Sequence, residues 1–293
     1  MTVFCDISLA GRIERAEAQF IAAYSEAAAA RRDDGTGFAR PIAGGVASYA
    51  EADSPLNKVA GLGFAGPPDP VDLEAIEQAY AVRGAPIQIE FASLADAAVL
   101  ELLAGRGYRL VSFENVLGRA LGGPVEPVEA PGVEVRPSGD AEFDTWLAVA
   151  VEAAMHPDTQ GVPWLEEFPR EILENAERDA AGLVQRYLAR LDGVPAGGGS
   201  MRIADGIAQL TGAGTAPAFR RRGIQSALLS ARLADAAAAG CDLAVITVQP
   251  GSKSQQNAQR RGFDLLYTRA VLANEDSSSR RLAADREPAS WCR

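Results

Sequence analysis

The segment of residues 213–228, AGTAPAFRRRGIQSAL, gathers residue types that could bind an anion. A β-prone stretch runs into a proline, then into Arg220, Arg221, Arg222 and Gly223, and ends in a run of helix formers. This order predicts a turn with free backbone amides at the start of a helix, where the helix dipole attracts negative charge. The arginines add permanent positive charge, and a glycine lets a phosphate approach the backbone. The segment therefore predicts a phosphate site, the alternative being a solvated basic run at a helix start.

The same residues resemble the coenzyme-A-binding motif of the GNAT superfamily of acyl-CoA-dependent N-acyltransferases, Arg/Gln-x-x-Gly-x-Gly/Ala after the fourth strand. Arg220, Gly223 and Ile224 match this pattern, and Gln225 replaces its last small residue. Residues 252–272 are similar to the closing helix and last strands of that family. The resemblance extends over roughly residues 131–275 and is faint before them.

The resemblance implies that acetyl-CoA is the acyl-donor substrate, with no metal. The backbone of the preceding strand would bind the pantetheine arm and the acyl carbonyl, and a gap beside residues 243–248 would admit that arm. The serine after the motif could donate a hydrogen bond to a phosphate. The implied coenzyme-binding residues are Ala213, Thr215, Arg220, Arg221, Arg222, Gly223, Ile224, Gln225, Ser226 and Asn257.

The catalytic acid and base stay unassigned. Many family members have a tyrosine four residues before the closing Gly-Phe, and this chain has Ala258 there. Tyr267 is a possible substitute, although a strand tyrosine more often packs in the core. Gln209, on the strand before the motif, cannot take a proton near neutral pH. Water relays or Glu166 and Glu167, in the helical region expected over the acceptor site, are the options for the base.

Two other residues have structural interpretations that we favour over functional ones. His156 is the single histidine of the chain and lies next to a proline in the turn-rich loop 155–165, which is typical of a surface residue. Trp146 belongs to the apolar stripe of a predicted helix over 141–154, so we expect it in the core.

Composition restricts the class of partner. The chain has 293 residues, of which 47% are hydrophobic, and a net charge of -11, typical of a globular protein without a basic face for nucleic acid. Its 3 cysteines are too scattered for a disulfide framework or a zinc site. No apolar stretch approaches the ~18 residues of a membrane span, and the N-terminus lacks a signal-peptide pattern. We therefore expect a cytoplasmic protein.

The elements that must position the motif occur twice in outline. Each half of the chain has a strand, a loop, a helix, a strand, a helix, a Gly-aromatic pair and an apolar strand pattern, separated by the Pro- and Gly-rich stretch 122–132. In the first half the predicted strands and helices cover 58–64, 73–82, 87–91, 94–104 and 110–117, and in the second half 208–211, 224–239, 243–248, 254–261 and 265–272. The second half also has a predicted helix over 166–179 and a predicted hairpin around Asp192-Gly193. We predict an α/β (α+β) fold of two tandem GNAT-like domains, each a mixed twisted sheet flanked by helices. Their expected limits are 1–121, a linker over 122–132, 133–275, and a flexible tail over 276–293.

The loop of the first half differs where chemistry would occur. Its sequence at 66–74, GPPDPVDLE, replaces the arginines with Asp69 and Asp72, and its prolines remove amide donors. Such a loop should not bind coenzyme A. The first half is therefore predicted to be a degenerate domain that packs on the second, the alternative being a module of unrelated topology.

The leading functional hypothesis is an N-acetyltransferase that moves an acetyl group from acetyl-CoA to an amine of a small molecule or peptide, directly within a ternary complex. A homodimer is possible, and neither nucleic acid nor membrane is an expected partner. The competing hypothesis is a catalytically inactive acyl-CoA-binding regulator, which turnover would distinguish. A nucleotide-binding P-loop protein is excluded because the Gly-x-x-x-x-Gly-Lys-Ser/Thr string is absent from residues 213–228.

Overall fold

The computed structural model describes residues 2–123, 125, 128–158, 162 and 167–274. The first half of this described part contains α1 (Ile7–Arg32), β1 (Phe38–Ile42), β2 (Gly45–Tyr49), β3 (Lys58–Ala60), α2 (Pro70–Ala81), β4 (Gln88–Ala92), α3 (Ala98–Gly105) and β5 (Tyr108–Ala120). The second half contains β6 (Val133–Ser138), η1 (Asp140–Glu142), α4 (Phe143–Met155), α5 (Arg170–Ala180), β7 (Gln185–Leu191), β8 (Val194–Ala204), β9 (Ile207–Thr215), η2 (Pro217–Phe219), α6 (Ile224–Ala238), β10 (Leu243–Val248), α7 (Lys253–Arg260) and β11 (Asp264–Asn274).

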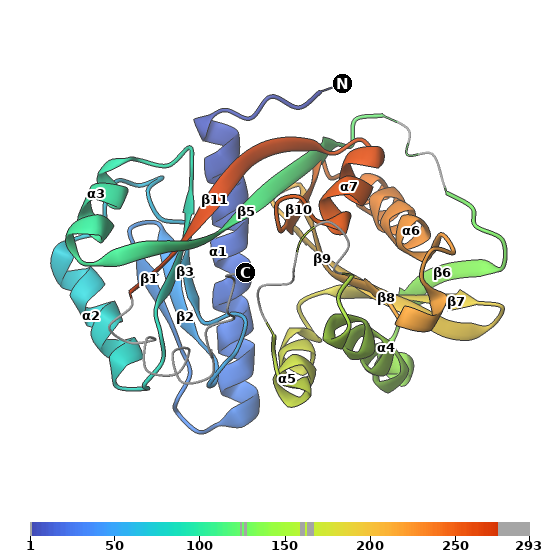
Figure 1. The fold of residues 1–293 in the computed structure, drawn as a ribbon, viewed down its shortest axis with the longest axis horizontal. Helices are drawn as coiled ribbons and strands as arrows, with labels where there is room; N and C mark the ends of the chain where they lie inside the picture. The colour runs from blue at the N-terminus through green and yellow to red at the C-terminus, as the bar shows by residue number, and fades with distance from the viewer. Residues whose placement is uncertain (1, 124, 126–127, 159–161, 163–166, 275–293) are drawn as a thin grey trace, which may run out of the picture.

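All of these strands form one mixed sheet in the order β1-β2-β3-β4-β11-β5-β10-β9-β8-β7-β6, with helices on its faces (Figure 1). The pairs β3–β4 and β9–β10 are parallel, and the remaining neighbours are antiparallel. This mixed α/β architecture confirms the predicted fold class. The sheets of the two halves are continuous with each other.

The two halves exchange strands at their junction. The second part of β5, from Asn115 to Ala120, pairs with β10 of the second half. The second part of β11, from Arg269 to Ala273, pairs with β4 of the first half. β5 and β11 also pair with each other along most of their lengths, and both long strands cross the middle of the molecule in Figure 1. Each half of the sheet is therefore completed by a strand from the other half.

A buried ionic cluster fixes helix α1 across this junction. Glu14 of α1 is 1% exposed and accepts hydrogen bonds from the Tyr267 hydroxyl at 2.6 Å and from Arg269 Nε at 2.7 Å. Arg269 also lies 3.4 Å from Glu90, which binds Lys58. Because leaving one member of a buried ion pair unpartnered is costly, this cluster fixes how α1 lies on the exchanged strands.

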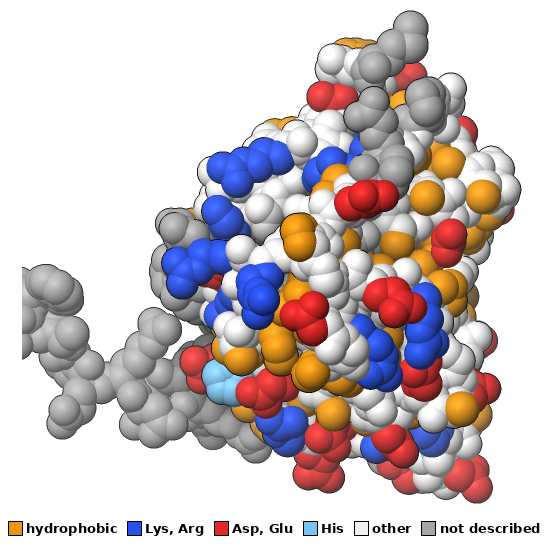
Figure 2. All heavy atoms as spheres, turned by 90° about the vertical axis from the view of Figure 1, so that its right-hand side faces the viewer, with side chains coloured by type: hydrophobic (Ala, Val, Ile, Leu, Met, Phe, Trp, Pro, Cys, Tyr) orange, Lys and Arg blue, Asp and Glu red, His pale blue; other side chains and the backbone are white. Residues whose placement is uncertain are grey.

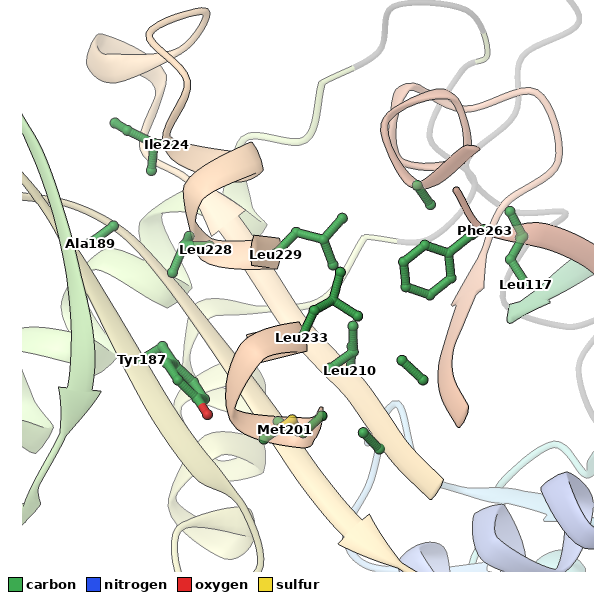
Figure 3. Packing of buried hydrophobic residues seen from close by; sticks show 14 of the residues in the cluster. Leu117, Tyr187, Ala189, Met201, Leu210, Ile224, Leu228, Leu229, Leu233 and Phe263 are labelled. Atoms are coloured by element: carbon green, nitrogen blue, oxygen red, sulfur yellow. The ribbon is translucent and has the colours of Figure 1, made fainter. Parts of the chain in front are cut away.

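Helix α6 packs its apolar face on the second half of the sheet (Figure 3). Leu228, Leu229 and Leu233 are almost completely buried and belong to the same cluster as Leu210 of β9 and Phe263, which follows α7. Leucines at this helical spacing form the single apolar stripe that a helix needs to lie on a sheet. The packing sets the position of the α6 N-terminus relative to β9.

The run Gly197-Gly198-Gly199 in β8 is explained by its close neighbours on both faces. A Cβ on Gly197 would lie 2.8 Å from Gly214 O, and one on Gly198 would lie 3.1 Å from the Trp146 indole nitrogen. A Cβ on Gly199 would lie 3.3 Å from the Arg232 guanidinium carbon. Trp146 is fully buried, as expected. The glycines therefore let helices approach both faces of β8.

Three features differ from the sequence expectations. Helix α1 and the hairpin β1–β2 have no counterpart in the predicted elements, although Asp6 caps α1 by accepting a hydrogen bond from Leu9 N. β3 ends at Ala60 instead of continuing to residue 64, because Gly61 and Gly63 adopt positive φ angles of 80° and 87°. Helix α5 begins at Arg170, immediately after Pro169, and not at residue 166, which lies outside the described residues.

Candidate functional site

The loop between β9 and α6 presents an open helix N-terminus. Arg221 and Gly223 both have positive φ angles, 61° and 83°, which turn the chain sharply before Ile224 starts the helix. Gly223 is the N-cap residue, and among the described residues no side chain caps the first amides of α6. The free amides and the positive end of the helix dipole therefore make this N-terminus suitable for binding an anion.

The predicted arginines lie beside this end. A hollow there is lined by Arg221, Arg222, Gly223 and Ser226 on one side and by residues 128–131 on the other. Both arginines are exposed, and basic side chains gather on the surface shown in Figure 2. Arg220 instead donates a hydrogen bond to the carbonyl oxygen of His156. The structure thus brings two of the three arginines to the hollow and directs the third toward the end of α4.

Four other residues of the implied coenzyme site lie on the two elements beside the loop, and a fifth, Asn257, lies on α7. Ala213 and Thr215 are on the last part of β9, and the Thr215 hydroxyl is buried without a hydrogen-bond partner in the described chain. The Ile224 side chain is in the core, so only its amide faces the loop. Gln225 follows it in the first turn of α6. Asn257 is on α7, which follows β10 in the sequence, and it is partly buried.

Strands β9 and β10 separate beside the site. Their parallel pairing runs only from Ile207–Leu243 to Gln209–Val245, although β9 continues to Thr215. The register of β9 against β8 also shifts here, and Gly212 has a positive φ of 54°. A parallel pair that opens in this way leaves backbone groups of β9 free to bind an extended ligand, because they have no partner from β10.

A buried arginine supports the irregular part of β9. Arg232 of α6 is fully buried and donates hydrogen bonds from Nη1 to Ser200 O at 3.0 Å and to Thr211 O at 3.2 Å. Burial lowers the pKa of Arg232 to about 10, which still leaves it charged at neutral pH. The guanidinium therefore satisfies carbonyl groups at the register shift and connects α6 to the opening between the strands.

The structure gives Tyr267, the acid candidate named from the sequence, a structural role. Tyr267 is 4% exposed and its hydroxyl donates a hydrogen bond to Glu14, so it belongs to the buried ionic cluster. Burial and the Glu14 carboxylate raise its pKa well above the ordinary value. Ala258 lies in the core, and His156 is exposed beside Glu152. Glu166 lies outside the described residues, and Glu167 is exposed.

Two carboxyl groups that the sequence did not single out have near-neutral pKa values. Burial raises the pKa of Glu177, on α5, to about 7. Burial and the neighbouring Glu90 raise the pKa of Glu114, on β5, to about 7. Glu114 lies 3.7 Å from Arg269 and so adjoins the ionic cluster. No local pattern marks either residue, since burial of a carboxylate depends on tertiary packing.

The comparisons with known proteins match part of the chain to one family. Residues 149–263 match the model of the Acetyltransferase (GNAT) family. No curated protein matches the chain in sequence. The described part of the chain contains no helix long and apolar enough to cross a membrane.

Several solved structures have a similar fold. A GCN5-related N-acetyltransferase from Kribbella flavida aligns with a TM-score of 0.60 and 23% identity, over 85% of this chain and 95% of that one. A GCN5-related N-acetyltransferase from Sphaerobacter thermophilus aligns with a TM-score of 0.52 and 19% identity, over 69% and 65%. A tandem GNAT protein from the clavulanic acid biosynthesis pathway aligns with a TM-score of 0.50 and 12% identity, over 68% of each chain.

The described part of the chain has a mixed α/β fold of the kind found in GCN5-related N-acetyltransferases. More specifically, the chain contains a GNAT-family acetyltransferase domain and has the fold of tandem GNAT proteins.

Proposed function

We propose that the second half of the chain binds acetyl-CoA and transfers its acetyl group to an amine of a small molecule or peptide. The observation that carries this proposal is the uncapped N-terminus of α6, with Arg221 and Arg222 beside it, next to the point where β9 and β10 separate. The pyrophosphate would bind the loop amides and arginines. The pantetheine arm would lie between the strands, along the backbone of Ala213 and Thr215.

The amine would attack the thioester while both substrates are bound. Direct transfer requires little from the side chains beyond holding the two reactants together and providing proton transfer. The acceptor would approach from the face of β9 that carries α4 and α5, because α6 covers the opposite face. The net charge of -11 favours a cationic acceptor. We further propose that the domains span 1–121 and 133–275, that the protein works in the cytoplasm, and that it can form a homodimer.

An assay for free thiol tests this function. The whole chain is incubated with acetyl-CoA and, in turn, with a diamine, an amino sugar and a lysine-containing peptide. The proposal predicts thiol release that depends on the amine, with initial-rate lines that intersect when both substrates are varied. Binding of acetyl-CoA without amine-dependent thiol release across the panel contradicts the enzyme assignment. Parallel initial-rate lines contradict direct transfer.

A further inference from the structure

Glu177 lies over the part of β9 that has separated from β10. Its Oε1 is 3.5 Å from the point where a Cβ on Gly212 would stand, and the Ser200 hydroxyl is 3.0 Å from the same point. Gly212 is three residues beyond Gln209, the last β9 residue that pairs with β10. Gly212 has no side chain, so the Glu177 carboxyl group can lie close to the backbone of β9 at this residue.

This carboxyl group has no assigned structural task. No hydrogen bond or ion pair joins Glu177 to another residue in the described part of the chain, whereas Arg170, Arg178 and Asp179 of the same helix are paired. Arg170 binds Glu152 of α4, and Arg178 lies 3.9 Å from Asp144 of the same helix.

The charged and titratable groups that face α5 from α1, β7, β8 and β9 have partners other than Glu177. From α1, Arg31 and Arg32 contact Asp179, as does the Tyr24 hydroxyl. From β7, Arg186 binds Asp140 and the Ala181 carbonyl, and its charge opposes the effect of burial on Glu177. From β8 and β9, Ser200 and Thr211 bind each other through their hydroxyls at 2.9 Å.

The first half of the chain holds Glu177 in place. Asp179, two residues further along α5, has a fully buried side chain that lies 2.5 Å from Arg31 Nε and 2.7 Å from Arg32 Nη2. Tyr24, Ala28 and Ala180 pack together beside this ion pair. A group that must transfer protons works best when its helix is fixed in this way, because small displacements reduce the rate strongly.

We propose that Glu177 is the general base that deprotonates the acceptor amine, an assignment that rests on the acetyl-transfer function proposed above. The carboxylate takes one proton from the substrate ammonium group. The neutral amine then forms the C–N bond at the thioester carbonyl, and the C–S bond breaks. The leaving thiolate takes the remaining excess proton from the nitrogen, and Glu177 passes its own proton to water.

The near-neutral pKa of Glu177 fits this task, since a base of that strength is partly ionised at pH 7 and accepts a proton readily. Glu114 has a similar pKa but lies on β5, 3.7 Å from Arg269, and adjoins the ionic cluster, whereas Glu177 lies beside Gly212 of β9. Geometry therefore selects Glu177 over Glu114.

The test compares the wild type with Glu177→Gln and with Glu174→Gln, a matched control one turn earlier on α5 whose side chain is 37% exposed. Initial rates are measured from pH 5.5 to 9 with acetyl-CoA and the best amine of the panel, and calorimetry gives the acetyl-CoA Kd. Glu177→Gln should lower kcat by about 10²- to 10⁴-fold. The wild-type kcat should fall toward acid pH with a midpoint near pH 7, and Glu177→Gln should lose this fall while keeping an unchanged Kd for acetyl-CoA. Glu174→Gln should behave as the wild type.

A Glu177→Gln enzyme that keeps both kcat and the acid limb of the pH profile overturns this assignment and leaves the proposed function standing. A wild type that releases no thiol with any amine overturns both. If Glu177→Gln fails to fold, Glu177→Asp tests the assignment instead. This variant should keep the acid limb with a reduced kcat, because it retains the carboxyl group on a shorter side chain that lies further from the substrate. Loss of the acid limb in Glu177→Asp contradicts the assignment.

Discussion

Asp69 and Gly223 hold the same position in the two halves of the chain. Each is the N-cap of a helix, α2 or α6, that connects two parallel neighbouring strands. The Asp69 carboxylate accepts a hydrogen bond from Val71 N at 2.8 Å, whereas Gly223 provides no such cap. The first helix therefore closes its own N-terminus with negative charge, and the second leaves it open for an anion.

A bulky residue at Gly223 should weaken acetyl-CoA binding. A Cβ there would lie 2.6 Å from the Ala130 Cβ, and the φ of 83° is strained for any other residue. We expect Gly223→Val to raise the KM for acetyl-CoA about ten- to a hundredfold, equivalent to about 1.5–3 kcal/mol.

Gly240 provides the matched control for this variant. It follows the other end of α6 with a φ of 80°, and a Cβ there would meet nothing within 4 Å. Gly240→Val should therefore share the backbone strain and leave the KM unchanged. Equal KM values for the wild type and Gly223→Val would contradict the site.

Removal of the Asp69 cap should affect stability alone. Asp69→Ala loses the hydrogen bond to the first turn of α2, so the free energy of unfolding should fall by about 1 kcal/mol. Chemical denaturation measures this loss, with Asp72→Ala, which removes a first-turn charge without a cap, as the comparison. The KM for acetyl-CoA should not change. A changed KM would mean that the first half contributes to coenzyme binding.

Tyr267→Phe should separate a structural role from a catalytic one. The variant removes a buried hydrogen bond to Glu14, so we expect the free energy of unfolding to fall by about 1–3 kcal/mol with kcat unchanged. Tyr80→Phe is the control, because it removes another buried hydroxyl contact, to Ser48 O, in the first half. A large loss of kcat in Tyr267→Phe without a loss of stability would restore Tyr267 as the acid.

Truncation after Asn274 should leave the folded unit intact. β11 ends at this residue, and the predicted tail over 276–293 lies outside the described residues. We expect the same turnover and a thermal midpoint within about 2 °C of the wild type. Truncation after Thr268 is the contrast, because it removes Arg269 and the pairing of β11 with β4. A midpoint lowered by many degrees in the first variant would show that the tail belongs to the folded unit.

The turn before α6 was predicted correctly from the sequence because its signals are local. The glycine, the arginines and the following helix formers define the turn and the start of α6 at Ile224, and the apolar run Leu243–Val248 is β10 as expected. The hairpin at Asp192-Gly193 was also predicted, and both residues have the positive φ angles that such a turn requires.

The exchange of strands could not be predicted in the same way. The alternating apolar residues of β5 and β11 fit either half of the sheet, since a strand pattern shows which faces are buried and does not identify the neighbouring strand. Glu177 was missed for a related reason. It is one acid among several in a polar helix, and only the packing of α5 over Gly212 distinguishes it.

Calorimetric titration of the whole chain with acetyl-CoA measures how many helix N-termini bind the coenzyme. The intact chain is required because β5 completes the second half of the sheet and β11 the first. We expect one binding site per chain, greatly weakened in Gly223→Val and retained with unchanged affinity in Asp69→Ala. Two sites per chain, or equal affinity in the wild type and Gly223→Val, would contradict it.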